Sequence, residues 1–219
     1  MISVTTCNLK YFSGLISALL FSFTLSSCGD DDDAAVGTGN QFTFASSQFA
    51  TVESGDLDTS SASEVKGSGS FVANTPLSAV DSGSHFYFAS TLAPSSSLTL
   101  VGNGDKSNVN GVEMKFSNSD GSLKVTIAAG GKTQDISSYF SAQSATDVSY
   151  HIDLHNDETP SHVLIWAGNE SGFSEEAALY NSEENEAVPG NGTGSYWGMT
   201  MTAATITAVA REEPKFEED

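Results

Sequence analysis

Basic side chains are scarce in this chain. Its 219 residues hold 8 Lys and Arg against 28 Asp and Glu, which gives a formal net charge of −20. Nucleic-acid binding needs a basic face for the phosphates, so this charge excludes nucleic acid as a partner. The charge also repels the chain from anionic lipid, so electrostatic attraction alone does not hold it on a membrane.

Long apolar runs and helical periodicity are also missing. The main apolar run, at 15–25 (LISALLFSFTL), is far shorter than the roughly 20 residues that a bilayer-spanning helix needs. No long segment shows the 3.6-residue apolar period of an amphipathic helix. Charged residues are 16% of the chain, while 13 Phe supply enough apolar surface for one core. This composition favours one β-rich domain with polar loops and some additional segments.

The N-terminal segment reads as a processing signal. Lys10 precedes the run at 15–25, whose length is typical of the apolar part of a signal peptide. The run ends in Leu25-Ser26-Ser27-Cys28, which resembles the lipobox of bacterial lipoproteins. The resemblance implies that residues 1–27 are removed and that Cys28 carries the lipid, since several acyl chains anchor stably. The alternative is an ordinary secretory signal that ends in Cys.

Processing at this point has two consequences for the mature chain. The sequence has two cysteines, and Cys7 lies in the removed segment, so no disulfide is possible and stability must come from packing. Removing Lys10 leaves 28 acidic and 7 basic residues, or a charge of −21.

Residues 28–40 form an acidic, Gly-containing tether that cannot bury a core. Its Asp30–Asp33 run is repelled by an anionic leaflet, which holds the following domain off the surface. An acidic run after a lipidated Cys also resembles surface-export signals of some bacterial lipoproteins. This resemblance implies the bacterial cell envelope and favours the outer membrane, at its surface or periplasmic face. A solubilising spacer is the alternative.

From residue 41 to 211 the apolar pattern has period 2, which predicts an all-β fold, before a charged tail at 212–219. A hairpin is predicted at 111–127, with its turn at Asp120-Gly121. A second is predicted from 147–155 and 162–169, in which one face of the first strand is apolar and the other is polar and half-exposed. In 174–194 the one short helix predicted lies at 177–180. Short strands at this spacing predict an antiparallel β-sandwich.

The stretch 150–169 (YHIDLHNDETPSHVLIWAGN) resembles the central hairpin of concanavalin A-like and laminin G-like jelly rolls. The hairpin at 111–127 and the closing pattern at 198–209 stand in the order that this fold uses, so the resemblance covers 41–211. It implies a jelly roll from a group that contains lectins, adhesion modules and β-glucan hydrolases. Immunoglobulin-like and other sandwiches give similar alternation.

Motifs for catalysis are absent from the sequence. The hydrolases of the resembling group carry Glu-x-Asp-x-x-Glu on one strand. Glu113 has no acid two residues later, and Asp56-Leu57-Asp58 lacks the third acid. There is no Gly-x-Ser-x-Gly motif, and Gly102-Asn103-Gly104 lacks the rest of a phosphate-binding loop. The loop acids at 175–176 and 183–186 are expected to be solvated.

Histidines give the most pointed metal hypothesis. His151, Asp153 and His155 alternate on one predicted strand face, and a turn could bring His162 opposite His155. Imidazoles with a carboxylate suit Zn, Cu or Ni. The alternative is a polar strand face without metal. Ca²⁺ is a second possible ion, with oxygen donors at Asn103, Asp105 and Asn110, at Asp153, Asp157 and Glu158, and among the acids of 170–186.

Aromatic residues in or beside loops suggest a glycan-binding surface, because an exposed ring can stack on a sugar face. These are Tyr139, Phe140, Phe173, Tyr180, Tyr196 and Trp197, whereas Trp166 is expected in the core. Packing at the rim of the core is the alternative for each. The function predicted is a non-catalytic, surface-anchored binding module for glycan or for a host or extracellular-matrix protein. Two further hypotheses stay open: a jelly-roll glycoside hydrolase with an unrecognised acid pair, and a structural envelope lipoprotein without a small ligand.

Overall fold

A computed structural model of the chain describes residues 50–61, 63–73, 84–104, 111–155, 162–170, 173–183 and 196–211. Every described residue belongs to one compact unit, which lies within Ala34–Asp219. The predicted signal, tether and tail therefore lie outside the described residues. Within the part of the chain that the structure describes, no helix is both long and apolar enough to span a bilayer.

The described residues form strands and two short 3₁₀ helices, η2 (Ser137–Phe140) and η3 (Glu175–Ala177). The strands are β1 (Ala50–Asp58), β2 (Val65–Ala73), β3 (Ser84–Gly104), β4 (Val112–Ser119), β5 (Ser122–Ala129), β6 (Lys132–Asp135), β7 (Asp147–His155), β8 (His162–Ala167), β9 (Tyr180–Asn181) and β10 (Tyr196–Arg211). Every pairing among them is antiparallel. The predicted all-β antiparallel fold is confirmed.

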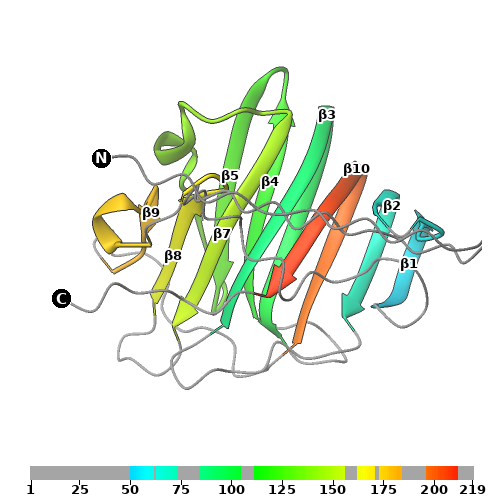
Figure 1. Ribbon diagram of the computed structural model, residues 1–219, viewed down its shortest axis with the longest axis horizontal. Helices are drawn as coiled ribbons and strands as arrows, with labels where there is room; N and C mark the ends of the chain where they lie inside the picture. Colours follow the sequence, from blue (N-terminus) through cyan, green and yellow to red (C-terminus); the bar gives the residue numbers. More distant parts are fainter. Residues whose placement is uncertain are drawn as a thin grey trace, which may run out of the picture. The chain divides into compact units, whose positions relative to one another are not determined.

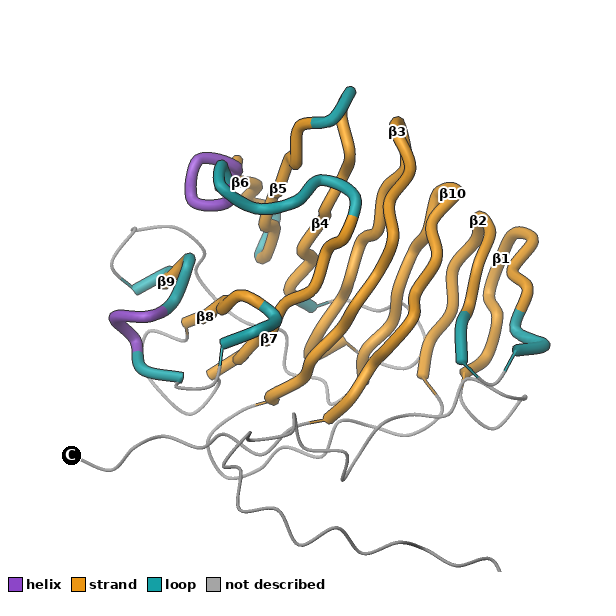
Figure 2. Tube along the Cα trace, turned by 45° about the horizontal axis from the view of Figure 1, so that its top comes forward, coloured by secondary structure: helices purple, strands orange, loops and turns teal. Residues whose placement is uncertain are grey.

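The long strand β3 belongs to two layers. One path of the sheet runs β1-β2-β10-β3-β4-β5-β6, and β7, β8 and β9 branch from β3. The first part of β3, 84–91, pairs with β7, and its second part, 97–102, pairs with β4. Figure 2 shows β4–β6 and β7–β9 as two separate groups on the same side of β3. β3 therefore joins the two layers of a β-sandwich.

A bulge in β3 marks the point where this strand changes partner. Ser97 pairs with Thr202 of β10, but the next pair is Leu92 with Ala204, so residues 93–96 lie outside the ladder. Ser95 has a positive φ of 68° within the bulge. Bulges bend strands and increase their twist, which allows one strand to serve two sheets.

Two serines fix the opposite strand at this corner. Ala203 of β10 has a φ of 48°. Its N–H donates to Ser68 Oγ at 2.9 Å, and its carbonyl accepts from Ser96 Oγ at 2.7 Å. These two bonds satisfy the backbone of Ala203 where the regular ladder is interrupted.

Aromatic rings from both layers meet in the core. Phe116 of β4 stacks on Tyr150 of β7, with ring centroids 5.2 Å apart and planes inclined by 17°. The ring of Phe140 in η2 is nearly perpendicular to both of these rings, with centroid distances of 6.4 Å to Phe116 and 5.3 Å to Tyr150. Phe88 of β3 lies 5.2 Å from Phe116, and all four side chains are no more than 1% exposed. The two layers thus share one apolar core.

Both predicted hairpins are present. In β4–β5, Ser119 pairs with Ser122, and the turn places Asp120 and Gly121 at φ of 53° and 86°. Both values are positive, as a two-residue hairpin turn of the favoured hand requires. The six predicted inward residues are all buried: Val112, Met114, Phe116, Leu123, Val125 and Ile127. In β7–β8, His155 pairs with His162, as predicted.

One expectation about β7 is wrong. Its apolar face, Val148, Tyr150, Ile152 and Leu154, is buried as predicted. The opposite face was expected to be half-exposed, but His151 is 3% and Asp153 is 0% exposed. Trp166 and Leu164 of β8 lie opposite these two residues and are also buried. The hairpin is therefore buried on both faces, which strand periodicity alone does not reveal.

Candidate functional site

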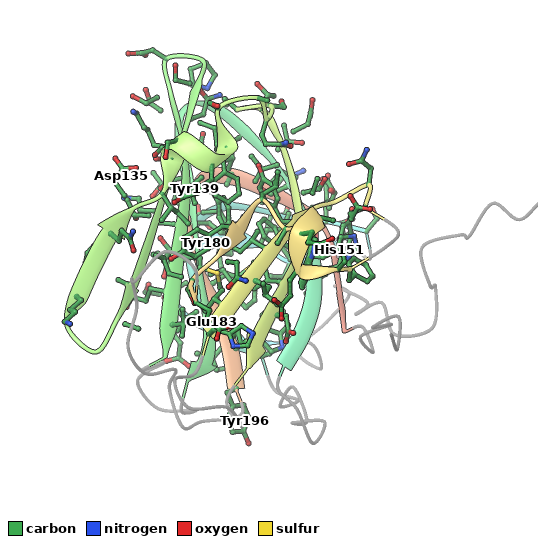
Figure 3. The ribbon with its side chains drawn as sticks, turned by 90° about the vertical axis from the view of Figure 1, so that its left-hand side faces the viewer. Asp135, Tyr139, His151, Tyr180, Glu183 and Tyr196 are labelled. Carbon is green, nitrogen blue, oxygen red and sulfur yellow. The ribbon has the colours of Figure 1, made fainter. Side chains whose placement is uncertain are left out.

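The predicted aromatic residues do not form one platform. Tyr139 of η2 is 40% exposed, and its ring meets Tyr180 of β9 edge-on at 5.4 Å. Tyr196 begins β10, opposite Gly104 of β3. Figure 3 shows Tyr139 above Tyr180, which lies near the middle of the strands, and Tyr196 at their lower end. A single sugar could not stack on all three rings.

Three of these aromatics are not exposed, contrary to expectation, and one of them is Phe140, which belongs to the core. Tyr180 and Trp197 are each 1% exposed, and Trp197 directs its ring against the edge of Phe71 at 6.0 Å. Burial, with a smaller effect of Tyr139, raises the pKa of Tyr180 to about 12. Both side chains follow the packing alternative because β9 and β10 are strands of the sandwich and direct these rings inward.

Phe173 packs onto the outer face of the β7–β8 hairpin. Its ring lies 4.8 Å from His151 and 5.5 Å from Trp166. The ring of Tyr87 also lies 4.8 Å from His151, so the imidazole contacts two aromatic rings. The indole N–H of Trp166 donates to the Ser174 carbonyl at 2.9 Å. Phe173 thus helps to cover a polar strand face, which accounts for its partial burial.

Of the four residues of the predicted metal set, only His162 belongs to the metal-binding group found among the described residues. His151 Nε2 lies 3.2 Å from the Gly168 carbonyl oxygen, a position that suits hydrogen bonding. Asp153 and His162 are buried on the same hairpin face, while the side chain of His155 lies outside the described residues. His162 does approach two carboxylates that were not in the predicted set, Glu175 and Glu183. Those glutamates were expected to be solvated loop acids and were also among the possible Ca²⁺ donors.

Most residues proposed for Ca²⁺ cannot be placed. Asp105, Asn110, Asp157 and Glu158 lie outside the described residues, as does the side chain of Asn103. Asp153 is fully buried, and the described acids of 170–186 are Glu170, which is half-buried, and the exposed Glu175, Glu176 and Glu183. The calcium hypothesis therefore stays a prediction.

A polar groove of about 560 Å³ lies where β5, β6 and η2 meet. Its polar lining includes Ser122, Lys124, Asp135, Ser137, Ser138 and Gln143. Phe140 and Leu123, which also line it, belong to the core beneath. Figure 3 shows Asp135 near Tyr139 at this end of the molecule. Tyr139 does not itself line the groove, because its ring is directed towards Tyr180.

Hydrogen bonds fix the floor of this groove. Ile136 N donates to the Val125 carbonyl at 2.9 Å, and Val125 N donates to Ser137 Oγ at 2.9 Å. Asp135 Oδ1 accepts from the N–H of Ser137 at 2.9 Å and also from its hydroxyl. These bonds lower the pKa of Asp135, so the carboxylate stays ionised. The segment after β6 is thereby tied to β5.

The groove offers the groups that recognise a polyhydroxylated ligand. Hydroxyls and amides both donate and accept, Asp135 accepts, and Lys124 donates. Sequence reasoning missed it because 132–143 has no apolar period and reads as an ordinary Ser-containing loop. The Asp135-Ile136-Ser137 spacing, typical of a side-chain turn, was the one local signal.

Comparison with known proteins adds no residue assignment. No protein-family model matches the chain, and no curated protein matches it. Among solved structures, the chain is similar to the galectin LEC-6 of Caenorhabditis elegans, with 7% identity and a TM-score of 0.42. The similarity covers 82% of this chain and 100% of the galectin chain.

Proposed function

We propose that this protein is a lipid-anchored binding module of the bacterial cell envelope. Cys28 carries the anchor, residues 28–40 act as the tether, and the β-sandwich binds glycan without transforming it. The groove between β5 and η2 is the binding site, and a glycan of a host surface or extracellular matrix is the partner. The proposal does not depend on a cofactor.

The composition of the groove carries this proposal. A glycan presents many hydroxyls, and the lining supplies serine hydroxyls, an amide, an ammonium and a carboxylate on a shallow surface. Specific sites place a few convergent polar groups on a preformed frame. The hydrogen bonds among Val125, Asp135 and Ser137 supply that frame here. Binding therefore needs little ordering of the protein, which limits its entropic cost.

The hydrolase alternative has one observation in its favour. Glu175 and Glu183 bring carboxylate oxygens within 4.8 Å of each other, near the separation that retaining glycosidases use. Both side chains are exposed, however, and an acid catalyst is normally kept protonated by an apolar pocket. Their neighbour His162 suits a different role, which is developed below.

A glycan array probed with the full chain, with and without EDTA, tests the binding function. We expect binding in both conditions, because the groove residues require no metal. Lys124→Ala combined with Gln143→Ala should weaken binding at least tenfold, since both side chains line the groove. Lys115→Ala is the matched control, because Lys115 is exposed on β4 outside the groove.

Three outcomes separate the alternatives. Absence of binding in both conditions would leave the structural envelope lipoprotein as the better hypothesis. Binding that survives the double variant would place the site elsewhere. Release of shorter glycans that stops in Glu175→Gln would show a hydrolase.

Incorporation of labelled palmitate tests the anchor separately. We expect label in the wild-type chain and in Cys7→Ala, and none in Cys28→Ala, because Cys28 is the residue that the lipobox resemblance selects. Label that persists in Cys28→Ala would refute lipidation there, while leaving the glycan test unaffected.

A further inference from the structure

Three metal-binding side chains from three different elements meet beside the β8–β9 edge. They are His162 at the start of β8, Glu175 in η3, and Glu183 just after β9. One donor atom from each lies within 4.8 Å of the other two. None of the three lines the groove between β5 and η2.

Strand register explains why His162 and Glu183 meet. β8 and β9 are antiparallel, and Leu164 pairs with Asn181. Continuing this register by two residues in each direction places Glu183 opposite His162, on the same face. The hydrogen bond from Ser182 N to the Val163 carbonyl, at 3.0 Å, shows that the ladder continues past Asn181. Side chains at such a pair have Cβ atoms roughly 5 Å apart.

Glu175 reaches the pair because η3 turns back towards the hairpin. The Trp166 indole holds the Ser174 carbonyl at 2.9 Å, and Leu179 N donates to the Ile165 carbonyl at 2.8 Å. These two bonds tie both ends of the η3 segment to β8. Glu175, the first residue of η3, is thereby held beside the β8–β9 ladder.

The local negative charge favours the binding of a cation. Two carboxylates this close repel each other, and a positive ion between them relieves the repulsion. Among the described residues, β8, η3 and β9 contain no Lys or Arg. The lysines whose side chains are described lie on β2, β4, β5 and β6.

We propose that His162, Glu175 and Glu183 bind one first-row divalent metal ion, with Zn²⁺ as the best match. An imidazole nitrogen with two carboxylate oxygens suits Zn²⁺, whereas Ca²⁺ and Mg²⁺ take oxygen ligands. Zn²⁺ bonds of about 2.0–2.1 Å require donor atoms roughly 3.3 Å apart, so the three groups must close in. His162 is 3% exposed, while both glutamates are exposed and can rotate towards it.

Three protein donors leave a position for water or for an oxygen of another molecule. The site keeps only His162 from the metal set predicted from the sequence. Bound metal would join β8, η3 and β9, and so stabilise this end of the β7–β9 layer. This consequence gives the test a second readout that is independent of affinity.

Calorimetric titration of the full chain with ZnCl₂ tests the proposal. The buffer should hold about 0.15 M salt and excess Mg²⁺, because a strongly acidic chain attracts cations nonspecifically and salt screens that attraction. We expect one tight site and a higher thermal midpoint with Zn²⁺. Glu175→Gln and Glu183→Gln should each weaken binding at least tenfold, and the double variant should lose both binding and the midpoint rise.

Glu176→Gln is the matched control, since Glu176 is an exposed acid in the same turn outside the cluster. It should bind Zn²⁺ as the wild type does. His162 is buried, so its replacement could disturb folding; the exposed glutamate variants avoid this problem. The proposal is overturned if Zn²⁺ does not bind, if the glutamate variants bind normally, or if Glu176→Gln loses as much affinity. Equal binding of Ca²⁺ would also overturn it, because an imidazole donor disfavours that ion.

Discussion

At the scale of single residues, Ala203 shows how the corner of the sandwich is built. Its left-handed backbone, with φ of 48°, is held by Ser68 and Ser96. A side chain in this conformation costs about 1–2 kcal/mol. The two serine bonds therefore stabilise a backbone geometry that alanine would not otherwise adopt.

Replacing Ala203 by glycine should stabilise the fold. Glycine removes the steric cost of about 1–2 kcal/mol but loses about 0.5–1 kcal/mol through its freer unfolded chain. We expect the free energy of unfolding, measured with urea, to rise by about 0.5–1 kcal/mol. Ala208→Gly, on the same strand without a positive φ, should lower it by a similar amount. Equal losses in both variants would contradict the argument.

The raised pKa of Tyr180 predicts that the protein loses stability at alkaline pH. Burial raises its pKa from 10.0 to about 12. The folded state therefore holds the phenol proton more tightly than the unfolded state does. The stability that this tighter binding of the proton contributes is fully present below pH 10 and is lost as the pH rises from 10 to 12. Urea unfolding at pH 9, 10 and 11 should show this fall, and a smaller fall in Tyr180→Phe. Tyr150, whose pKa burial also raises, adds to the effect in both proteins. An identical pH slope in the variant would exclude Tyr180 as a source.

At the scale of elements, Asn118 joins the β4–β5 hairpin to β3. The side chain is 2% exposed, donates to the Leu92 carbonyl at 2.9 Å and accepts from Gly121 N at 2.9 Å. Leu92 stands beside the bulge of β3, so this one amide holds the hairpin turn against the corner of the sandwich.

Asn118→Ala should destabilise the protein by about 2–3 kcal/mol, because it removes two hydrogen bonds and leaves a carbonyl without this donor. The measurement is the free energy of unfolding in urea. Ser119→Ala is the control: Ser119 is the exposed neighbour in the same turn, and its change should stay within about 0.5 kcal/mol. Equal effects would show that Asn118 has no special role.

The same elements show what the sequence could predict. Alternation together with Asp120-Gly121 identified the β4–β5 hairpin and its buried face. Alternation in β7 identified its apolar side but not what covers the polar side, because Phe173 follows β8 and reaches back over His151. β9 has two residues, too few to show any period, so the meeting of His162 with Glu183 could not be foreseen.

At the scale of the whole molecule, the charge of −20 should make stability depend on salt. Like charges repel in the compact state, and raising the ionic strength from about 0.01 to 0.1 M shortens the screening length from about 30 to 10 Å. We expect the thermal midpoint to rise by a few degrees in NaCl. Choline chloride should act equally if screening is the cause. A midpoint that falls with both salts would contradict the expectation.

The position of β10 also has a consequence for synthesis. The last strand that the structure describes, β10, lies between β2 and β3, as Figure 1 shows. Until residues 196–211 have left the ribosome, β2 and β3 each present an edge without its final partner. Non-local pairing of this kind is slow to form and exposes open strand edges in the meantime. The growing polypeptide therefore cannot complete its sandwich until β10 has emerged, so β2 and β3 must keep their facing edges open for most of synthesis.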